Sequence, residues 1–539
     1  MNGFTRIPSH LSAHGRVIAE YLLLLVFAAA ICLPGLFSRA ISYDESITLL
    51  QVAGNAALGR AASSTHPGWP TSPQPVGTLK PRLHGNVSLS EIALPLRRAD
   101  VHPPLYYWTL SYWRRAFGPS LETARALSLV CSVSAVCLLY AFCAFGGVRY
   151  PVLASLTFAL ASSTADQAQQ ARSNSMALML VAGVALVALL LWKHEAKSPL
   201  NRFLGFASVA LLGAASFMTN YMAAIPAAAI ILWLVVVIQR GRAALLIVVA
   251  AVGAGTLLVW APALSNQLSA RPSQFAGFKG FPVELASQLV AYANNLLSPA
   301  ISGEIGRLAF VAGIIAVACL CAFALLRTKS AGQPQFLALL WIWALAPVAG
   351  IMTLNVLFDK HLTEWRYFAF AVPAVAVLIT YKLGSFRQPL QGLAYSALAA
   401  LWLSQLLCAN WGYELTIGRR AAYYRSLAKS VEAIGTETSV LFAGTEFGDA
   451  IPGSLVYELP ESLPVVFLEV DSDPLEVAAV LDGYEHVWQV YGGGPTGPVE
   501  HAVADRLSEL GRSRQPFPDA VLFRRQPVQQ EGPTGRTLQ

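Results

Sequence analysis

Two adjacent carboxylates, Asp44 and Glu45, follow the first long apolar run of the chain by a few residues. If that run crosses a membrane, the pair lies at the interface with water, where a carboxylate loses part of its hydration and becomes more basic. Such a group can act as a general base that removes a proton from a hydroxyl. A second interpretation remains open, in which Asp44 and Ser46 cap and solvate the start of an interfacial helix.

The same connection ends in a segment rich in proline and aromatic residues, His-Pro-Pro-Leu-Tyr-Tyr-Trp at 102–108. Pro104 is typical of the first turn of a helix, where no N–H donor is needed. Tyr and Trp side chains collect at the depth of lipid headgroups. The segment therefore predicts a helix lying on the membrane, or a plain anchor, in the same connection as the two carboxylates.

Three cationic side chains, Arg172, Lys360 and Arg366, lie at the ends of later apolar runs. A lipid phosphate lies at that depth, and a guanidinium group binds two phosphate oxygens at once. These residues are therefore candidates for binding a lipid phosphate group. The alternative is that they only extend toward the lipid headgroups.

A divalent metal is a further candidate cofactor. His66, His84 and His102 share the first connection with the two carboxylates, but their spacing is not that of a compact ligand motif. If a metal binds, Glu45 and His102 are the expected ligands. All seven cysteines lie inside apolar runs, which argues against a disulfide framework or a thiolate metal cluster.

The elements that must position these residues are membrane helices. The 539 residues are 55% hydrophobic and only 12% charged, whereas soluble domains carry roughly 25% charged residues. About eleven apolar runs are long enough to cross a hydrocarbon core. The sequence thus predicts a mainly α, polytopic membrane protein. The expected spans lie near residues 17–38, 122–146, 150–166, 172–192, 202–220, 222–239, 243–264, 307–327, 335–357, 366–384 and 391–410.

Basic residues set the expected orientation. Arg149, Lys193, Arg240, Arg327 and Lys382 fall in short connections that all lie on one side of the membrane. The positive-inside rule makes that side the inner one, with the N-terminus inside. Such placement accounts for the formal charge of +7 without nucleic-acid binding.

The domain organisation follows from this orientation. Residues 1–410 form a transmembrane domain whose first outer connection is 39–121, and residues 411–539 form an outer domain. In the tail, β-like runs alternate with helical patterns, which predicts a small α/β domain with a disordered end. The expected strands are 439–443, 465–470, 486–491 and 520–524, and the expected helices are 474–481 and 499–510.

The motifs together resemble glycosyltransferase family 39 and its relatives with the C-type membrane fold, which include protein O-mannosyltransferases and the aminoarabinose transferases of lipid A. The resemblance covers residues 17–410. Asn174 and Asn220 depart from it, because the family often has Tyr and His or Lys there. The matching elements are Asp44-Glu45, the His-Pro-Pro-Leu-Tyr-Tyr segment, Arg125, the Gln-Gln-Ala-Arg run ending at Arg172, Thr219-Asn220-Tyr221, and Arg366-Tyr367 followed by Pro373.

The resemblance implies inverting transfer of a sugar from a polyprenyl-phosphate donor to an acceptor hydroxyl on the outer face of the membrane. The Ala-rich composition and short connections favour a bacterial inner membrane. The acceptor would be a lipid, a glycan or a protein. Asp44 would be the general base, with Glu45 beside it. The residues expected to bind substrate are His102, Tyr106, Arg125, Arg172, Tyr221, Lys360 and Arg366.

Three other classes remain as alternatives. Another polyprenyl-linked glycan ligase or polymerase would use the same donor, but such enzymes rely on a long late outer loop. A transporter or flippase usually places ionisable residues within its spans, and the span centres here hold almost none. A non-enzymatic scaffold is the third alternative.

Overall fold

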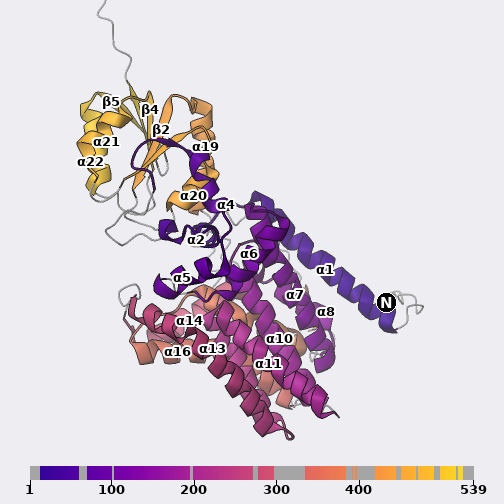
Figure 1. Cartoon of the computed structure of the whole chain (residues 1–539). Helices are drawn as coiled ribbons and strands as arrows, with labels where there is room; N and C mark the ends of the chain where they lie inside the picture. The colour runs from indigo at the N-terminus through magenta and orange to yellow at the C-terminus, as the bar shows by residue number, and fades with distance from the viewer. Residues whose placement is uncertain are drawn as a thin grey trace, which may run out of the picture. The chain divides into compact units, whose positions relative to one another are not determined.

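The computed structural model describes residues 13–59, 69–99, 102–194, 198–270, 277–296, 334–383, 419–444, 451–468, 472–490, 498–517 and 520–525, and five residues between 391 and 398 (Figure 1). The chain divides into two compact units. Unit 1 comprises Met1–Arg39 and Asn86–Ile417, and unit 2 comprises Ala40–Gly85 and Gly418–Gln539. Residues 40–85, expected as part of an outer connection of the transmembrane domain, thus group with the tail.

Unit 1 is a bundle of long apolar helices, which confirms the predicted mainly α membrane fold. Seven helices of the described residues are long and apolar enough to cross a membrane, and η2–α12 (Tyr221–Val237) is a shorter apolar helix. In Figure 1, α7, α10, α11 and α13 run alongside one another. The long helices are α1 (Ala13–Ser38), α7 (Leu121–Gly146), α10 (Ser173–Lys193), α11 (Pro199–Thr219), α13 (Arg242–Ala270), α16 (Pro334–Phe358) and η3–α17 (Trp365–Ala371, Val372–Leu383).

The packing of unit 1 is that expected of a protein surrounded by lipid. Buried alanines such as Ala135 and Ala177 lie in the core, where small side chains let helix backbones approach closely. Large apolar side chains also face outward: Leu258 of α13 is 80% exposed and Ile247 is 68% exposed. A row of such side chains would be costly in water and is stable against lipid.

One expected span is interrupted. The run at 150–166 forms two short helices, α8 (Pro151–Ala159) and α9 (Ser162–Ala168), which meet at an extended residue, Ala161. The polar sequence Ser-Ser-Thr at 162–164 offers the backbone alternative hydrogen bonds, and Ser163 Oγ bonds to Asn295 O at 3.1 Å. The expected span at 307–327 lies outside the described residues, as does most of 391–410.

Three further helices of unit 1 are not among the candidate spans. They are α5 (Leu89–Ala99), α6 (Leu105–Phe117) and α14 (Phe281–Leu296). Pro104 is the N-cap residue of α6, so the predicted helix after the two prolines is confirmed. Its indoles hold it in place, since Trp108 Nε1 donates to Leu89 O at 3.0 Å and Trp113 Nε1 to Thr123 O at 2.8 Å.

Unit 2 is an α/β unit, which confirms the predicted small domain of the tail. Its six-stranded sheet has the order β1-β3-β2-β4-β6-β5. Strands β2, β3 and β4 are parallel, whereas β1, β5 and β6 each pair antiparallel with their neighbours. The strands are β1 (Gln74–Pro75), β2 (Ser439–Gly444), β3 (Pro464–Leu468), β4 (His486–Val490), β5 (Arg512–Phe517) and β6 (Ala520–Arg525).

Helices complete unit 2. From the tail come α19 (Arg419–Ile434), α20 (Ile451–Glu458), α21 (Pro474–Leu481) and α22 (Pro498–Glu509), and from the first connection come α2 (Tyr43–Val52), η1 (Ala56–Gly59), α3 (Val76–Leu79) and α4 (Pro81–His84). Two strands were not predicted. β5 is an exposed edge strand, so its residues are mostly polar and show no strand pattern. β1 is only two residues long, too short to give a pattern.

Candidate functional site

The two adjacent carboxylates of unit 2 have different surroundings. Ser42 caps α2: the Glu45 amide donates to Ser42 Oγ at 3.3 Å, and the Ser42 amide donates to Glu45 Oε2 at 2.9 Å. This is a capping box, and the Glu45 side chain is buried in it. The helix is thus capped by Ser42 and Glu45 rather than by Asp44 and Ser46. Asp44, only half-buried in the first turn of α2, is the more accessible carboxylate.

The tail packs directly against α2. The Ile41 amide, just before the helix, donates to Glu458 Oε1 at 2.9 Å, and Arg425 Nε pairs with Glu458 Oε2 at 3.1 Å. Ser454 Oγ bonds to Ser46 Oγ at 3.3 Å on the buried side of α2. The position of Asp44 within unit 2 therefore depends on residues of the tail, about 400 positions later in the sequence.

Gly453 lies where α20 packs closely against α2. A Cβ at residue 453 would lie 3.1 Å from Ser46 Cβ and 3.4 Å from Leu50 Cδ1. We expect Gly453→Val to push the two helices apart and to lower the free energy of unfolding by about 1–3 kcal/mol. Thermal unfolding of the full-length protein checks this result. Gly483→Val is the control, because a Cβ there meets one atom at an ordinary 3.4 Å; an equal loss from both variants would contradict the prediction.

In unit 1, a buried ion pair lies beside the end of α1. Arg39 Nη2 bonds to Asp166 Oδ1 at 2.8 Å, and the two side chains are 5% and 6% exposed. Gln170 Nε2 donates to Asp166 Oδ2 at 2.8 Å. Arg125 donates to Leu36 O at 3.0 Å and Arg39 O at 2.7 Å, so it caps the carbonyls that α1 leaves unpaired. Arg125, expected to bind substrate, thus fixes the residue that pairs with Asp166.

Tyr106 is linked to Arg172 through a serine. The Tyr106 hydroxyl lies 3.3 Å from Ser128 Oγ, which donates to Arg172 O at 3.3 Å. Tyr106 is fully buried, and Arg172 is buried at the N-cap position of α10. His102 packs edge-on against Tyr107 with ring centroids 6.4 Å apart. The aromatic segment therefore supports the start of α10 in unit 1.

Asn174 and Asn220, the two residues that depart from the family pattern, form a hydrogen bond with each other. Asn220 Nδ2 donates to Asn174 Oδ1 at 3.1 Å, which links the end of α11 to the start of α10. Next in the chain, the Tyr221 hydroxyl accepts from Trp260 Nε1 at 2.6 Å. Asn174 and Asn220 therefore form a neutral pair where the family pattern places Tyr and His or Lys.

The segments that carry Arg172, Tyr221 and Arg366 meet at one end of the bundle. Helix α10 begins directly after Arg172, and it contacts both η2 (Tyr221–Ala223) and η3 (Trp365–Ala371). η2 and η3 contact each other, and η3 also contacts α9, which carries Asp166. The Arg366 guanidinium lies over the Tyr367 ring, 5.8 Å from its centroid. Three expected substrate-binding positions, far apart in sequence, thus belong to neighbouring elements.

The expected metal site is not assembled within either unit. Glu45 belongs to unit 2 and His102 to unit 1, and His66 lies outside the described residues. Among the residues that the structure describes, no group of three or more His, Cys, Asp or Glu side chains could hold a metal ion. The metal site therefore stays a prediction.

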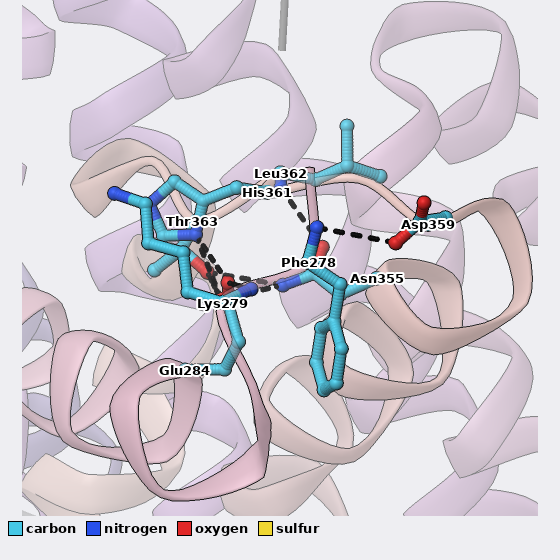
Figure 2. A network of polar contacts seen from close by, with 8 residues as sticks. All are labelled: Phe278, Lys279, Glu284, Asn355, Asp359, His361, Leu362 and Thr363. Carbon is cyan, nitrogen blue, oxygen red and sulfur yellow. Dashed lines mark hydrogen bonds and ion pairs between the residues drawn. The ribbon is translucent and has the colours of Figure 1, made fainter. Parts of the chain in front are cut away.

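Sequence reasoning missed several polar residues of unit 1, chief among them Asp166, Glu284 and His361. Asp166 lies in a polar stretch at 162–170, and its position between two apolar runs could have marked it. Glu284 and His361 lie in separate segments that give no local sign of pairing, yet His361 Nδ1 lies 2.6 Å from Glu284 Oε1 (Figure 2).

Solved structures of other proteins share this fold. No protein-family model and no curated protein matches the chain. A crystal structure of ArnT from Cupriavidus metallidurans bound to undecaprenyl phosphate is similar, with a TM-score of 0.53 at 12% identity over 95% of this chain and 98% of that one. The apo structure of the same protein gives a TM-score of 0.52 at 12% identity, over 94% and 98%. The chain therefore has the C-type membrane fold that its motifs predict.

Proposed function

We propose that this protein is a membrane glycosyltransferase that moves a sugar from a polyprenyl-phosphate donor to an acceptor hydroxyl on the outer face of the membrane. The observation that carries the proposal is the meeting of α10, η2 and η3, which brings together the segments of Arg172, Tyr221 and Arg366. The fold shared with ArnT, a protein crystallised with undecaprenyl phosphate, supports the choice of donor class. The acceptor is a lipid, a glycan or a protein.

The proposed reaction is a single displacement. Asp44 takes the proton of the acceptor hydroxyl, whose oxygen attacks the anomeric carbon. The bond between that carbon and the phosphate oxygen breaks, and the lipid phosphate leaves with the electron pair, which inverts the anomeric configuration. Arg172, Lys360 and Arg366 stabilise the charge that develops on the phosphate. No acid is required, because a phosphate monoester is already a weakly basic leaving group.

The first test is a transfer assay with full-length protein in liposomes. Labelled polyprenyl-phosphate sugars extracted from membranes serve as the donor, and total membrane lipids, glycans and membrane proteins are offered as separate acceptor fractions. We expect covalent label in one fraction, and none from a nucleotide sugar. Label that enters the vesicle lumen without a covalent product would instead favour a transporter, and no product in any fraction would contradict the proposal.

Arg366→Gln tests the phosphate contact in the same assay. Loss of a charge-assisted hydrogen bond costs about 1.5–3 kcal/mol. We therefore expect kcat/KM for the lipid-linked donor to fall about 10-fold to 100-fold, while the KM for the acceptor stays constant. Arg524→Gln, on an exposed residue of β6, is the matched control. Unchanged donor kinetics in the Arg366 variant would remove this residue from the proposed site.

A further inference from the structure

One face of α14 carries polar side chains that are buried in unit 1. Glu284, Gln288 and Asn295 are separated by four and seven positions, so they lie on the same side of the helix. All three are 0% exposed. Polar side chains inside a membrane protein are costly and often line the path of a substrate. This polar face of α14 therefore needs hydrogen-bond partners from within the fold or from a ligand.

The polar face of α14 is directed toward η3. At Glu284, the hydrogen bonds come from the segment that leads into η3, where Thr363 Oγ1 donates to Oε2 at 3.1 Å (Figure 2). One turn beyond Gln288, Ala291 packs in an apolar cluster with Phe368 of η3. Gln288 lies between these two contacts on the same side of the helix, so its side chain also faces η3.

Helix α9 brings a second polar side chain to the same region. Ser163 Oγ donates to Asn295 O at 3.1 Å, so this side of α9 faces α14. Gln167 follows one turn later on that side. Its carbonyl accepts from Ser175 Oγ at 2.8 Å, in the first turn of α10. Because α9, α14 and η3 contact one another, Gln167 and Gln288 lie on neighbouring elements.

Both carboxamides have unused hydrogen-bonding capacity. In the part of the chain that the structure describes, neither Oε1 nor Nε2 of Gln167 and Gln288 has a hydrogen-bond partner. The two side chains are 2% and 0% exposed, so bulk water does not replace the missing bonds. Almost all buried polar groups in proteins are paired, and an unpaired one points to a ligand or an enclosed water. A carboxamide both donates and accepts, so it matches a hydroxyl group, whereas an ionised phosphate mainly accepts.

The chemistry of this region favours an uncharged sugar. Asp166, the acidic residue of α9, bonds to Arg39 Nη2 at 2.8 Å. Glu284, the acidic residue of α14, lies 2.6 Å from His361 Nδ1. Both carboxylates are thus bound within the protein rather than left to pair with an ammonium group of a sugar, and a carboxamide carries no charge to pair with a uronate. The hydroxyls of a neutral sugar therefore fit these surroundings best.

We propose that Gln167 and Gln288 bind the sugar of the lipid-linked donor through its hydroxyl groups, and that this sugar is neutral. The inference rests on the proposed function, which takes Arg172 and Arg366 to bind the phosphate of the same donor. Gln167 lies beside the first turn of α10, which follows Arg172, and Gln288 faces the element that carries Arg366. Since both side chains are buried, α9, α14 and η3 enclose the bound sugar.

The test compares the binding of undecaprenyl phosphate, with and without a sugar, to the full-length protein in nanodiscs. The sugars are glucose, mannose and galactose, which are neutral, and an aminopentose and a uronic acid, which are charged. The ratio of the dissociation constants with and without the sugar measures the contribution of the sugar alone. We expect at least one neutral sugar to tighten binding about tenfold, the effect of one or two hydrogen bonds, and the charged sugars to tighten it less.

Gln288→Met is the decisive variant, because Met keeps the unbranched shape of Gln but makes no strong hydrogen bond. We expect the preference for the sugar-bearing lipid to fall about tenfold, while binding of undecaprenyl phosphate is unchanged and thermal stability is equal or higher. Gln167→Met is expected to behave alike. Gln489→Met is the control: Gln489 is 1% exposed, but its Nε2 donates to Glu500 O at 3.4 Å, so this change should lower stability and leave the sugar preference unchanged.

Each other outcome overturns a defined part. A wild-type sugar preference in both variants, or no sugar that tightens binding to the wild type, overturns the inference and leaves the proposed function standing; the two carboxamides would then hold water only. An effect of one variant alone removes the other residue from the site. Tightest binding of a charged sugar overturns the neutral class. Equal weakening of both lipids with lower thermal stability makes the residues structural and overturns the inference. Failure of the wild type to bind any of these lipids overturns the donor class and this inference together.

Discussion

Replacement of Asp44 by Asn is expected to lower the rate of sugar transfer by about 10²-fold to 10⁴-fold, with no change in thermal unfolding. Asn matches Asp in size but cannot take a proton at neutral pH, so the acceptor hydroxyl would have to attack unaided. Asp44 lies half-buried in the first turn of α2, and the capping bonds of that turn come from Ser42 and Glu45. The change therefore leaves the cap of the helix intact.

Glu45→Gln is the matched comparison for Asp44→Asn. Gln is the other residue that closes a capping box, so this variant keeps the hydrogen bond to the Ser42 amide and loses only the charge. We expect it to retain most of the transfer activity. A collapse of activity in Glu45→Gln with little effect of Asp44→Asn would reverse the roles of the two carboxylates. Full activity in both variants would remove the pair from the reaction.

The second large effect concerns stability. Asp166→Ala is expected to lower the free energy of unfolding by about 3–5 kcal/mol, because it leaves the buried Arg39 guanidinium without its carboxylate. It also removes the acceptor of Gln170 Nε2. Thermal or denaturant unfolding in detergent measures the loss.

Asp166→Asn separates charge from hydrogen bonding at the same position. It keeps an oxygen for Arg39 or Gln170 but loses the charge, so we expect a smaller loss of stability than in Asp166→Ala. Equal stability of the wild type and Asp166→Ala would mean that the pair contributes nothing beyond its desolvation cost. That outcome would contradict the stabilising role assigned to the Arg39–Asp166 ion pair.

The sequence predicts the parts of the fold that have a local signature. Runs of about 20 apolar residues predicted the long helices, and Pro104 marked the start of α6. The expected span at 150–166 ran into the polar stretch that begins at Ser162, and the helix is in fact interrupted just before it, at Ala161. Strand β5 was missed because an exposed edge strand carries polar residues on both faces.

The candidate site is predictable only as a set of separate segments. The sequence marks Arg172, Tyr221 and Arg366 at the ends of apolar runs, but only the packing shows that their elements are neighbours. Neither Glu284 nor His361 has a local pattern, because the pair joins residues 77 positions apart. The sequence likewise could not place residues 40–85 with the tail, since the pairing of β1 with β3 has no local signature.

That pairing constrains how the chain crosses the membrane and how it is made. β1 and β3 share one sheet, so residues 40–85 and the tail must lie on the same side of the bilayer. The chain must then cross an even number of times between Asn86 and Ile417, a condition that the ten spans expected there satisfy. During synthesis, α2 and β1 emerge long before their partners, and their contacts have high sequence separation. The helix that carries Asp44 therefore reaches its final packing only after α20 and β3 have been made and delivered to the same compartment.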